Sequence, residues 1–267
     1  MHTKISIITV TKNSEKTIAH TLNSIKSQTY KNIEHIIVDG NSIDRTKGII
    51  QDYIKKKPFL KIKFISEKDF GIYDAINKGI KLSSGKYISI LNSDDIFHSN
   101  KTVETIMKII EKNKDNELFF FGLTYFRKKN FKKIVRYYPA KNFKKWMLRY
   151  GIIPPHPASV IKKSTYIKHG NYDKNFKIAG DFDLLLRFIF VKKIKFKTFN
   201  FNTVKMKTGG ASGKNLSSYI LSLKENRISF KKYNLFSNIF LILLKVPSKL
   251  FQFIFFNQKK LNKNFWK

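Results

Sequence analysis

Ile88-Ser89-Ile90-Leu91-Asn92-Ser93-Asp94-Asp95 is a short apolar run that ends abruptly in two adjacent carboxylates. Its isoleucines and the polar residues after them predict a buried strand whose carboxyl end delivers Asp94 and Asp95 to a crevice. Adjacent like charges raise each other's pKa unless a cation or hydrogen-bond donors compensate them, so a divalent metal is the natural partner. The alternative is that Asp95 only caps a following helix or turn.

Three earlier segments follow the design of a buried strand followed by a helix. The predicted strands are 5–10, 34–39, 62–66 and 87–91, and apolar residues at helical spacing follow each of the first three. This alternation predicts βαβ units and a mostly parallel sheet, with ligands bound beyond the carboxyl ends of the strands. Acids lie at or just past that edge, at Asp39, Asp69, Asp94 and Asp95. Helix caps alone would not need to gather at one edge, so a ligand site is favoured there.

The pattern changes after a predicted helix at 101–112. Segments 118–126 and 132–138 are rich in apolar and aromatic residues, and they predict an antiparallel pair of strands. A short helix at 140–150 and strands at 194–199 and 203–206 are expected to follow. The second half of the sheet should therefore be mixed rather than doubly wound.

Two single residues stand out in this second half. His156 is held in Pro154-Pro155-His156-Pro157 before a strand, and this stiff setting favours a site role, although a lone histidine is more often structural. Asp181 precedes a strongly apolar helical segment, so it lies near a helix amino terminus, where the helix dipole stabilises a carboxylate. The alternative for Asp181 is a plain N-cap.

The chain has 53 Lys plus Arg against 18 Asp plus Glu, a net charge of +35 over 267 residues. A basic surface of this size favours polyanionic partners: nucleic acid, an anionic membrane face, or nucleotide and phosphate substrates. The hydrophobic content of 42% excludes a disordered chain, and the length allows one large α/β domain or a domain with an appendage. The absence of cysteine excludes disulfides and thiolate metal sites and fits a reducing cytoplasm. We expect no signal peptide, because the first strand begins at Ile5 without an apolar leader.

The last part of the chain, residues 235–256, is intensely apolar. Lys245, Pro247 and Lys249 interrupt it, so it lacks the run of about 20 apolar residues that a spanning helix requires. Lysines at 259, 260, 263 and 267 follow, and this combination predicts an interfacial anchor on an anionic leaflet. The alternative is one or two helices that pack on the domain or on a second subunit.

Dinucleotide-binding, P-loop, nucleophile-elbow and HExxH motifs are absent from the sequence, so the acids must carry the chemistry. Five motifs in order resemble those of family 2 glycosyltransferases: Ile5–Val10 with Asn13, Val38–Thr46, Asp69–Gly79, Leu91–Asp95 and Gly180–Asp183. The resemblance covers roughly Lys4 to Ser212. It implies a GT-A fold, that is, an α/β Rossmann-like mixed sheet flanked by helices. The expected organisation is a catalytic domain at 1–213 and a C-terminal helical, membrane-associating extension at 214–267.

The resemblance also implies roles for particular residues. Asp39 would hold the base or ribose of a nucleotide, and Asp94 and Asp95 would stand for the family's DXD element. Asp95 is the expected direct ligand of Mg²⁺ or Mn²⁺, which would neutralise the leaving diphosphate. Asp181 matches the catalytic base, and Asp183, further into the helix, is the alternative. The other implied donor-binding residues are Thr9, Asn13, Asp69, Gly71, Asn77 and His156, with a closing loop at Gly209, Gly210 and Ser212.

These features predict a metal-dependent, inverting glycosyltransferase with a nucleotide-sugar donor, a UDP-sugar being favoured. The expected acceptor is a lipid-linked glycan in surface polysaccharide biosynthesis. The expected location is cytoplasmic, peripheral on the inner face of the plasma membrane, with the anionic membrane surface as a partner. The alternatives are a basic nucleic-acid-binding protein and a non-catalytic nucleotide-sugar-binding protein. Because the lysines lack an interleaved recognition motif and the acids would be idle, nucleic acid is not an expected partner.

Overall fold

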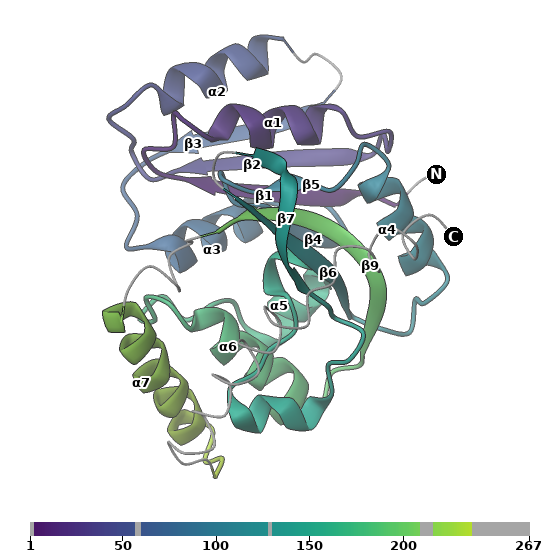
Figure 1. Cartoon of the computed structure of the whole chain (residues 1–267), viewed down its shortest axis with the longest axis vertical. Helices are drawn as coiled ribbons and strands as arrows, with labels where there is room; N and C mark the ends of the chain where they lie inside the picture. The colour runs from purple at the N-terminus through teal and green to yellow at the C-terminus, as the bar shows by residue number, and fades with distance from the viewer. Residues whose placement is uncertain (1–2, 57–59, 128–129, 209–215, 237–267) are drawn as a thin grey trace.

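The computed structural model of the chain describes residues 3–56, 60–127, 130–208 and 216–236 (Figure 1). Its centre is a nine-stranded mixed sheet with the strand order β3-β2-β1-β4-β8-β6-β9-β5, and β7 pairs with β6 outside this path. The first four strands are β1 (Ile5–Thr11), β2 (Ile33–Asp39), β3 (Lys61–Ser66) and β4 (Tyr87–Ile90). They pair in parallel, as the strand and helix alternation predicts.

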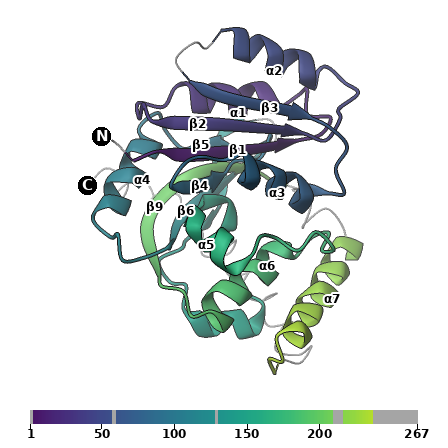
Figure 2. The ribbon, with the colours of Figure 1, turned by 180° about the vertical axis from the view of Figure 1, so that it is seen from behind.

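Helices cover both faces of this parallel half. Helices α1 (Ile18–Lys26) and α2 (Thr46–Lys55) lie on one face and α3 (Ile72–Leu82) lies on the other (Figures 1 and 2). Because side chains alternate along a strand, β2 serves both faces. Ile37 packs in the cluster that contains Ile18 and Ile50, whereas Ile36 packs in the cluster that contains Ile76. Strands buried on both faces explain the continuous apolar runs in the sequence.

The second half of the sheet is mixed, as predicted. Strand β8 (Ser159–Lys162) is antiparallel to both β4 and β6 (Leu118–Arg127), and β7 (Asn130–Tyr138) is antiparallel to β6. Strand β9 (Phe196–Lys207) runs parallel to β6, and the short β5 (Ile96–Phe97) is antiparallel to β9. The mixed half therefore joins the parallel half through the β4–β8 pair.

The sequence-based prediction of two strands at 194–199 and 203–206 is wrong, because β9 is one long, curved strand (Figure 1). Its pairing with β6 shifts register around Gly122: Phe120 pairs with Thr198, but Gly122 pairs with Asn202. The extra residues of β9 form an irregularity of the β-bulge type, which bends the strand and breaks the alternation of apolar residues. That break is what made one strand look like two.

The remaining described helices are α4 (Thr102–Glu111), α5 (Lys163–His169), α6 (Gly180–Leu185) and α7 (Leu216–Lys232). A π-helical turn, η3 (Leu186–Val191), directly continues α6. Two 3-10 segments complete the set, η1 (Lys145–Tyr150) and η2 (His156–Ala158). The helix expected at 140–150 is thus shorter than predicted, because Ala140 and Phe143 are buried in a turn that precedes it.

Helix α7 packs against α6, where the rings of Phe182 and Phe230 lie 5.4 Å apart between centroids (Figure 2). The expected domain boundary at 213 and the expected closing loop at Gly209, Gly210 and Ser212 lie outside the described residues, and so does the apolar tail from 237 onward. Within the described segments, no helix combines the length and apolar character that crossing a membrane requires.

Candidate functional site

A cleft of about 1100 Å³ lies at the carboxyl ends of β1 and β4. Its walls come from the β1–α1 segment, the first turn of α3, the turn after β4 and the end of β9. The lining residues are 10–17, Asp44, Asp69, Gly71, Ile72, Ala75, 92–94 and 206–208. This is the sheet edge at which ligands are expected in such folds. Of the residues that the sequence singles out, the cleft brings together Asn13, Asp69, Gly71 and Asp94.

Asn13 ties the loops after β1 and β2 to each other. Its backbone adopts a left-handed conformation with φ 49°, which Asn tolerates better than most residues. Its N–H donates to Ser42 Oγ at 2.8 Å, and its Oδ1 accepts the N–H of Ile43 at 3.0 Å. The exposed Asn13 amide is therefore fixed at the cleft wall by bonds that leave its Nδ2 group available to a ligand.

Asp39 lies beneath this loop and is fully buried. Its carboxylate accepts the N–H of Ser42 at 2.9 Å, the hydroxyl of Ser42, and the hydroxyl of Ser66 at 2.6 Å. It is not among the residues that line the cleft. In this conformation Asp39 holds the loop after β2, and the expected direct contact with a base or ribose would require Ser42 to move.

Asp69 and Gly71 line the cleft just before the start of α3. Asp69 Oδ1 accepts the N–H of Gly71 at 3.0 Å, just before α3 begins. Gly71 has φ 123° and ψ 176°, a conformation that is open almost only to glycine. Gly40 must also lack a side chain, because a Cβ there would lie 2.2 Å from Asp69 Oδ2. The two glycines explain how a carboxylate is brought close to the backbone at this edge of the sheet.

The acidic pair that ends β4 is split between cleft and interior. Asp94 lines the cleft, whereas Asp95 is fully buried. The N–H of Asp95 donates to the carbonyl of Asn92 at 3.0 Å, so the pair sits in a tight turn that leads into β5, not into a helix. Of the alternative that Asp95 caps a following helix or turn, the helix part does not hold, and in the turn it is the backbone N–H of Asp95 that bonds to Asn92.

The Asp95 carboxylate is short of donors. Its Oδ2 accepts the Asn92 amide at 3.3 Å, but Asp95 Oδ1 and Asn92 Oδ1 are both buried without a hydrogen-bond partner among the described residues. Burial and the neighbouring Asp94 charge raise the pKa of Asp95 well above its usual range. The unpaired buried oxygens of Asp95 and Asn92, beside the Asp94 carboxylate at the cleft, match the all-oxygen ligands that Mg²⁺ and Mn²⁺ prefer.

A complete metal cage is not present. In the part of the chain that the structure describes, no three or more His, Cys, Asp or Glu side chains group closely enough to hold a metal ion. Mg²⁺ is commonly held by one or two carboxylates plus substrate phosphates and water, so an incomplete protein cage is compatible with a site that a diphosphate completes.

Thr9, Asn77 and His156 are not among the cleft-lining residues, and each is bonded within the protein. Thr9 is fully buried, and its hydroxyl lies 3.0 Å from His35 Nε2; burial lowers the pKa of His35 to about 3. The Asn77 side chain donates to the carbonyl of Tyr172 at 2.8 Å and accepts its N–H at 3.0 Å. His156 Nε2 lies 2.6 Å from the Tyr172 hydroxyl. Asn77 and His156 thus fix the segment that precedes α6.

Asp181 lies in the first turn of α6, half-buried, and is not the N-cap, because that position belongs to Ala179. The first turn of α3 connects it to the cleft. Gly71 and Ile72 line the cleft, while the hydroxyl of Tyr73 lies 3.4 Å from the N–H nitrogen of Asp181. Burial, with the Asp181 charge as a second cause, raises the pKa of Tyr73 well above its usual range. Asp181 is not among the residues that line the cleft, but its charge acts on the hydroxyls of Tyr73 and Tyr172, and Tyr73 directly follows the cleft-lining Ile72.

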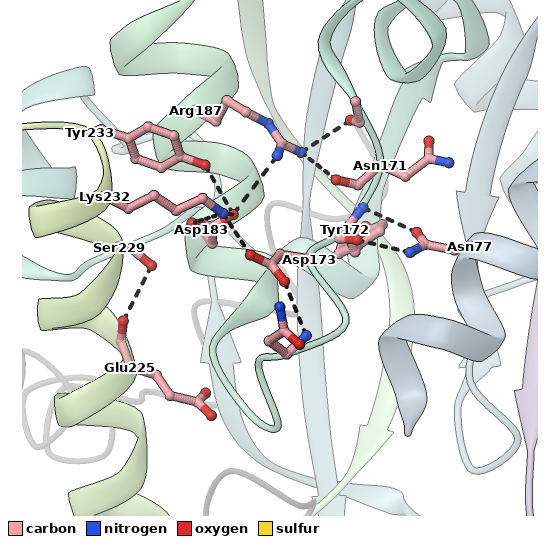
Figure 3. Close-up of polar contacts among 12 residues, drawn as sticks. Asn77, Asn171, Tyr172, Asp173, Asp183, Arg187, Glu225, Ser229, Lys232 and Tyr233 are labelled. Carbon is pink, nitrogen blue, oxygen red and sulfur yellow. Dashed lines mark hydrogen bonds and ion pairs between the residues drawn. The ribbon is translucent and has the colours of Figure 1, made fainter. Parts of the chain in front are cut away.

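Asp183 is committed to a different task. It is fully buried, and both of its oxygens lie 3.4 Å from Lys232 Nζ (Figure 3). The hydroxyl of Tyr233 donates to it at 3.1 Å, and an Arg187 nitrogen lies 4.0 Å away. A buried carboxylate with three such partners is a structural anchor between α6 and α7.

Helix α7 also holds the segment just before Asp181. The buried carboxylate of Glu225 accepts three consecutive backbone N–H groups, from Lys177 at 2.8 Å, Ile178 at 3.0 Å and Ala179 at 2.7 Å. Lys232 additionally pairs with Asp173 at 2.7 Å (Figure 3). These bonds fix the segment before α6 against α7. They therefore also fix the position of Asp181 in the first turn of α6.

Sequence reasoning missed several basic residues at the site. Lys12, Lys16 and Lys207 line the cleft beside the acids. Arg136 of β7 lies over the ring of Tyr125 at 4.9 Å and over the ring of Tyr138 at 5.6 Å. Single lysines and one arginine carry no signal in a chain with 53 basic residues, so only the fold could distinguish them.

The fold and this cleft define a GT-A type protein. A solved structure of S. aureus TarS in complex with UDP-GlcNAc aligns with a TM-score of 0.65 at 16% identity, covering 98% of this chain and 76% of TarS. The mannosyltransferase PcManGT from Pyrobaculum calidifontis, solved with GDP-Man and Mn²⁺, aligns with a TM-score of 0.63 at 15% identity, covering 87% of this chain and 64% of PcManGT. At these identities the likeness shows the fold.

The family is shown by sequence. The family model described as Glycosyl transferase family 2 matches residues 6–170, and the chain belongs to that family. An uncharacterized glycosyltransferase of Rickettsia prowazekii is 30% identical over 72% of this chain and 60% of its own length. An uncharacterized glycosyltransferase of Methanocaldococcus jannaschii is 31% identical over 69% of this chain and 64% of its own length. The matched region thus spans slightly under two thirds of these relatives.

Proposed function

We propose that the chain transfers a sugar from a nucleotide-diphosphate sugar, preferably a UDP-sugar, to an acceptor hydroxyl with inversion at the anomeric carbon. The observation that carries the proposal is the arrangement along α3. Its first turn closes the cleft that holds Asp69 and Asp94, and its Tyr73 contacts the α6 turn that holds Asp181. A donor site and a separate carboxylate are thereby joined by one rigid element. Family membership and the UDP-GlcNAc complex of TarS support this reading.

On the donor side, the exposed amide of Asn13 and the carboxylate of Asp69 line the cleft and are available to the nucleotide. Lys12, Lys16 and Lys207 supply positive charge for the diphosphate. The oxygens of Asp95 and Asn92, with Asp94, would hold Mg²⁺ or Mn²⁺, and the Mn²⁺ complex of PcManGT supports a divalent ion. When bound, such an ion neutralises charge on the leaving diphosphate.

On the acceptor side, Asp181 takes the proton from the attacking hydroxyl. Inversion needs a base on the face opposite the leaving group, and a carboxylate from a separate late element meets this need. Asp183 does not compete for the role, since Lys232, Tyr233 and Arg187 already surround it. Its bonds instead keep α6, and therefore Asp181, in place.

For the acceptor we propose a lipid-linked glycan in surface polysaccharide biosynthesis, used at the cytoplasmic face of the plasma membrane. The support is the composition of the chain: an apolar and aromatic segment at 235–256 followed by lysines, in a protein with a net charge of +35. We infer a peripheral association in which residues 214–267 contribute an anchor.

The decisive experiment measures ligand-induced thermal stabilisation across UDP-, GDP- and dTDP-sugars, with and without Mn²⁺. We expect UDP-sugars with Mn²⁺ to raise the melting temperature most, and the stabilising donor to be turned over with release of its nucleoside diphosphate. Stabilisation by none of these donors would remove the proposed function. Stabilisation without turnover would instead support a non-catalytic nucleotide-sugar-binding protein.

A further inference from the structure

A basic and aromatic patch lies on the surface of η1 and the end of η3, away from the cleft. Trp146 is 56% exposed, and its ring meets that of Tyr150 edge to face at 5.7 Å between centroids. The two elements are joined through Phe190, because Lys145 Nζ lies 5.0 Å and Arg149 Cζ lies 5.1 Å from the centre of its ring. We call this surface the η1–η3 patch; its members are Lys144, Lys145, Trp146, Arg149, Tyr150, Phe190, Val191, Lys192 and Lys193.

The η1–η3 patch carries only positive charge. The sequence has no Asp or Glu between residues 118 and 172 or between 184 and 224, so neither segment of the patch contains an acid. Lys144, Lys192 and Lys193 are exposed, and Val191 beside them is 37% exposed. A tryptophan and a valine that face solvent beside exposed lysines are unusual on a surface that only needs to be soluble.

We propose that the η1–η3 patch docks on the surface of an anionic phospholipid bilayer. Tryptophan and tyrosine prefer the membrane–water interface, where the ring is in the apolar layer and the polar group is hydrated. Lysine and arginine beside them are attracted to anionic headgroups, and their stems reach along apolar surface. A nucleic acid would use the charge but gives the exposed Val191 no partner, so the lipid surface fits more of what the patch presents.

The position of the patch relative to Asp181 gives the docking a purpose. Helix α6 and η3 form one continuous helical stretch, Gly180–Val191, with Asp181 in its first turn and the patch at its end. At 1.5 Å per residue the two are separated by about 15 Å along the axis. Figures 1 and 2 place α6 in the half of the molecule away from α2. A bilayer at the patch would hold a lipid-linked hydroxyl within reach of Asp181. This purpose rests on the proposed function, whereas the docking itself does not.

Trp146 can report on the docking directly. The chain has two tryptophans, Trp146 and Trp266, so a full-length Trp266→Phe variant contains only the patch tryptophan. Its emission is measured with vesicles of phosphatidylcholine alone and of phosphatidylcholine with phosphatidylglycerol, with and without brominated acyl chains. We expect a blue shift and quenching by brominated lipid only when phosphatidylglycerol is present, and we expect both to fade at high salt.

Charge reversal provides the matched comparison. Lys144→Glu with Lys192→Glu, in the Trp266→Phe background, changes two exposed lysines of the patch, and Lys55→Glu with Lys56→Glu makes the same charge change at the exposed end of α2. We expect the patch variant to need at least tenfold more anionic lipid for half-maximal quenching, and the α2 variant to need less than threefold more. Equal losses, no quenching of Trp146, or an equal response to neutral vesicles would overturn the proposal.

Two other occupants are tested in the same format. A blue shift that depends on protein concentration without vesicles would assign the patch to a second copy of this chain, and a shift with single-stranded DNA that competes with vesicles would assign it to nucleic acid. Either result overturns membrane docking. None of these measurements requires a donor sugar, so failure of the docking and failure of the proposed transferase activity are recognised separately.

Discussion

Two aspartates two residues apart, Asp181 and Asp183, have opposite surroundings. Asp181 is half-buried beside Tyr73, whereas Asp183 is fully buried among Lys232, Tyr233 and Arg187. We expect Asp181→Asn to lower sugar transfer by about 100-fold or more, the scale of general base catalysis, with little effect on UDP affinity or melting temperature. The measurement is steady-state transfer combined with calorimetric UDP binding.

Asp183→Asn should show the reverse pattern. It places a neutral amide in the fully buried position beside Tyr233, while the partly exposed Lys232 keeps its ion pair with Asp173, so we expect the free energy of unfolding to fall by about 1–3 kcal/mol. Transfer by the fraction that remains folded should be much closer to that of the parent protein than transfer by Asp181→Asn. Urea unfolding at 25 °C checks the first effect. If Asp183→Asn abolishes transfer while Asp181→Asn does not, the roles of the two acids are exchanged.

Substitution of Asp95 should change protein stability and metal binding in opposite directions. Its carboxylate is buried with one oxygen unpaired and Asp94 adjacent, an arrangement that destabilises the protein when no cation is bound. We therefore expect Asp95→Asn to raise the free energy of unfolding in EDTA by about 1 kcal/mol. The same variant should lose the stabilisation that Mn²⁺ with UDP gives the parent protein. Equal Mn²⁺-dependent stabilisation in both proteins would contradict the role of Asp95 as a metal ligand.

At the scale of elements, α7 is the support of α6. Glu225 accepts three backbone N–H groups from residues 177–179, immediately before the turn that carries Asp181. Glu225→Gln replaces one acceptor oxygen by a donor, so we expect a loss of about 1–3 kcal/mol in the free energy of unfolding. Because the α6 turn is then less well held, transfer should fall about tenfold or more while UDP affinity is kept.

Glu34→Gln is the matched control for this prediction. Glu34 is also a buried carboxylate, and it accepts from the backbone N–H of Ser84 at 2.7 Å and the hydroxyl of Ser6 at 2.7 Å. It belongs to β2, at the opposite end of the strand from Asp39. We expect comparable destabilisation but less than a twofold change in transfer at a temperature where both variants are folded. Equal loss of transfer in the two variants would assign Glu225 a purely structural role.

The elements also show what sequence could and could not predict. Apolar period and strand-end acids are local features, so the four parallel strands, their helices and the mixed second half were predictable. The bulge opposite Gly122 was not, because register is set by two strands together. Motifs placed Thr9 and Asn77 at the donor site, but a motif cannot distinguish a ligand contact from a buried bond to His35 or Tyr172. Pairing of Asp183 with α7 likewise depends on contacts 49 residues apart in sequence.

Over the whole molecule, acids and bases are unevenly distributed. Four acids line the cleft, and Asp173, Asp183 and Glu225 join α7 to the segment around α6, whereas residues 118–172 and 184–224 are bordered by acids but contain none. A nucleotide-sugar donor that binds together with a divalent cation is suited to a cleft lined by carboxylates. An anionic bilayer surface is suited to the segments that contain no acids. Asp181 and the acid-free η1–η3 patch thus lie at opposite ends of the continuous α6–η3 helical stretch.

The stability of the whole molecule should depend on pH through its buried histidines. Burial lowers the pKa of His35 from 6.5 to about 3 and, with help from Lys205, that of His98 from 6.5 to about 4. The unfolded chain therefore binds more protons than the folded chain below pH 6.5, so the free energy of unfolding falls as pH decreases from 6.5 toward 4. Each histidine contributes up to about 1.4 kcal/mol per pH unit.

Below pH 4.5 the slope should steepen, because hydrogen bonds to the folded protein lower the pKa of Glu34 to about 2 against the opposing effect of burial. This stabilising contribution is present above 4.5 and is lost as pH falls toward 2. Urea unfolding between pH 7 and 5 covers the range in which the lowered pKa values of the histidines act, and the raised pKa of Asp95 contributes there with the opposite sign. His35→Gln should reduce the slope there by up to about 1.4 kcal/mol per pH unit. An unaltered slope in His35→Gln would mean that the Thr9–His35–Tyr53 network accepts a proton without loss, and that the core of the parallel half is more accessible than its packing indicates.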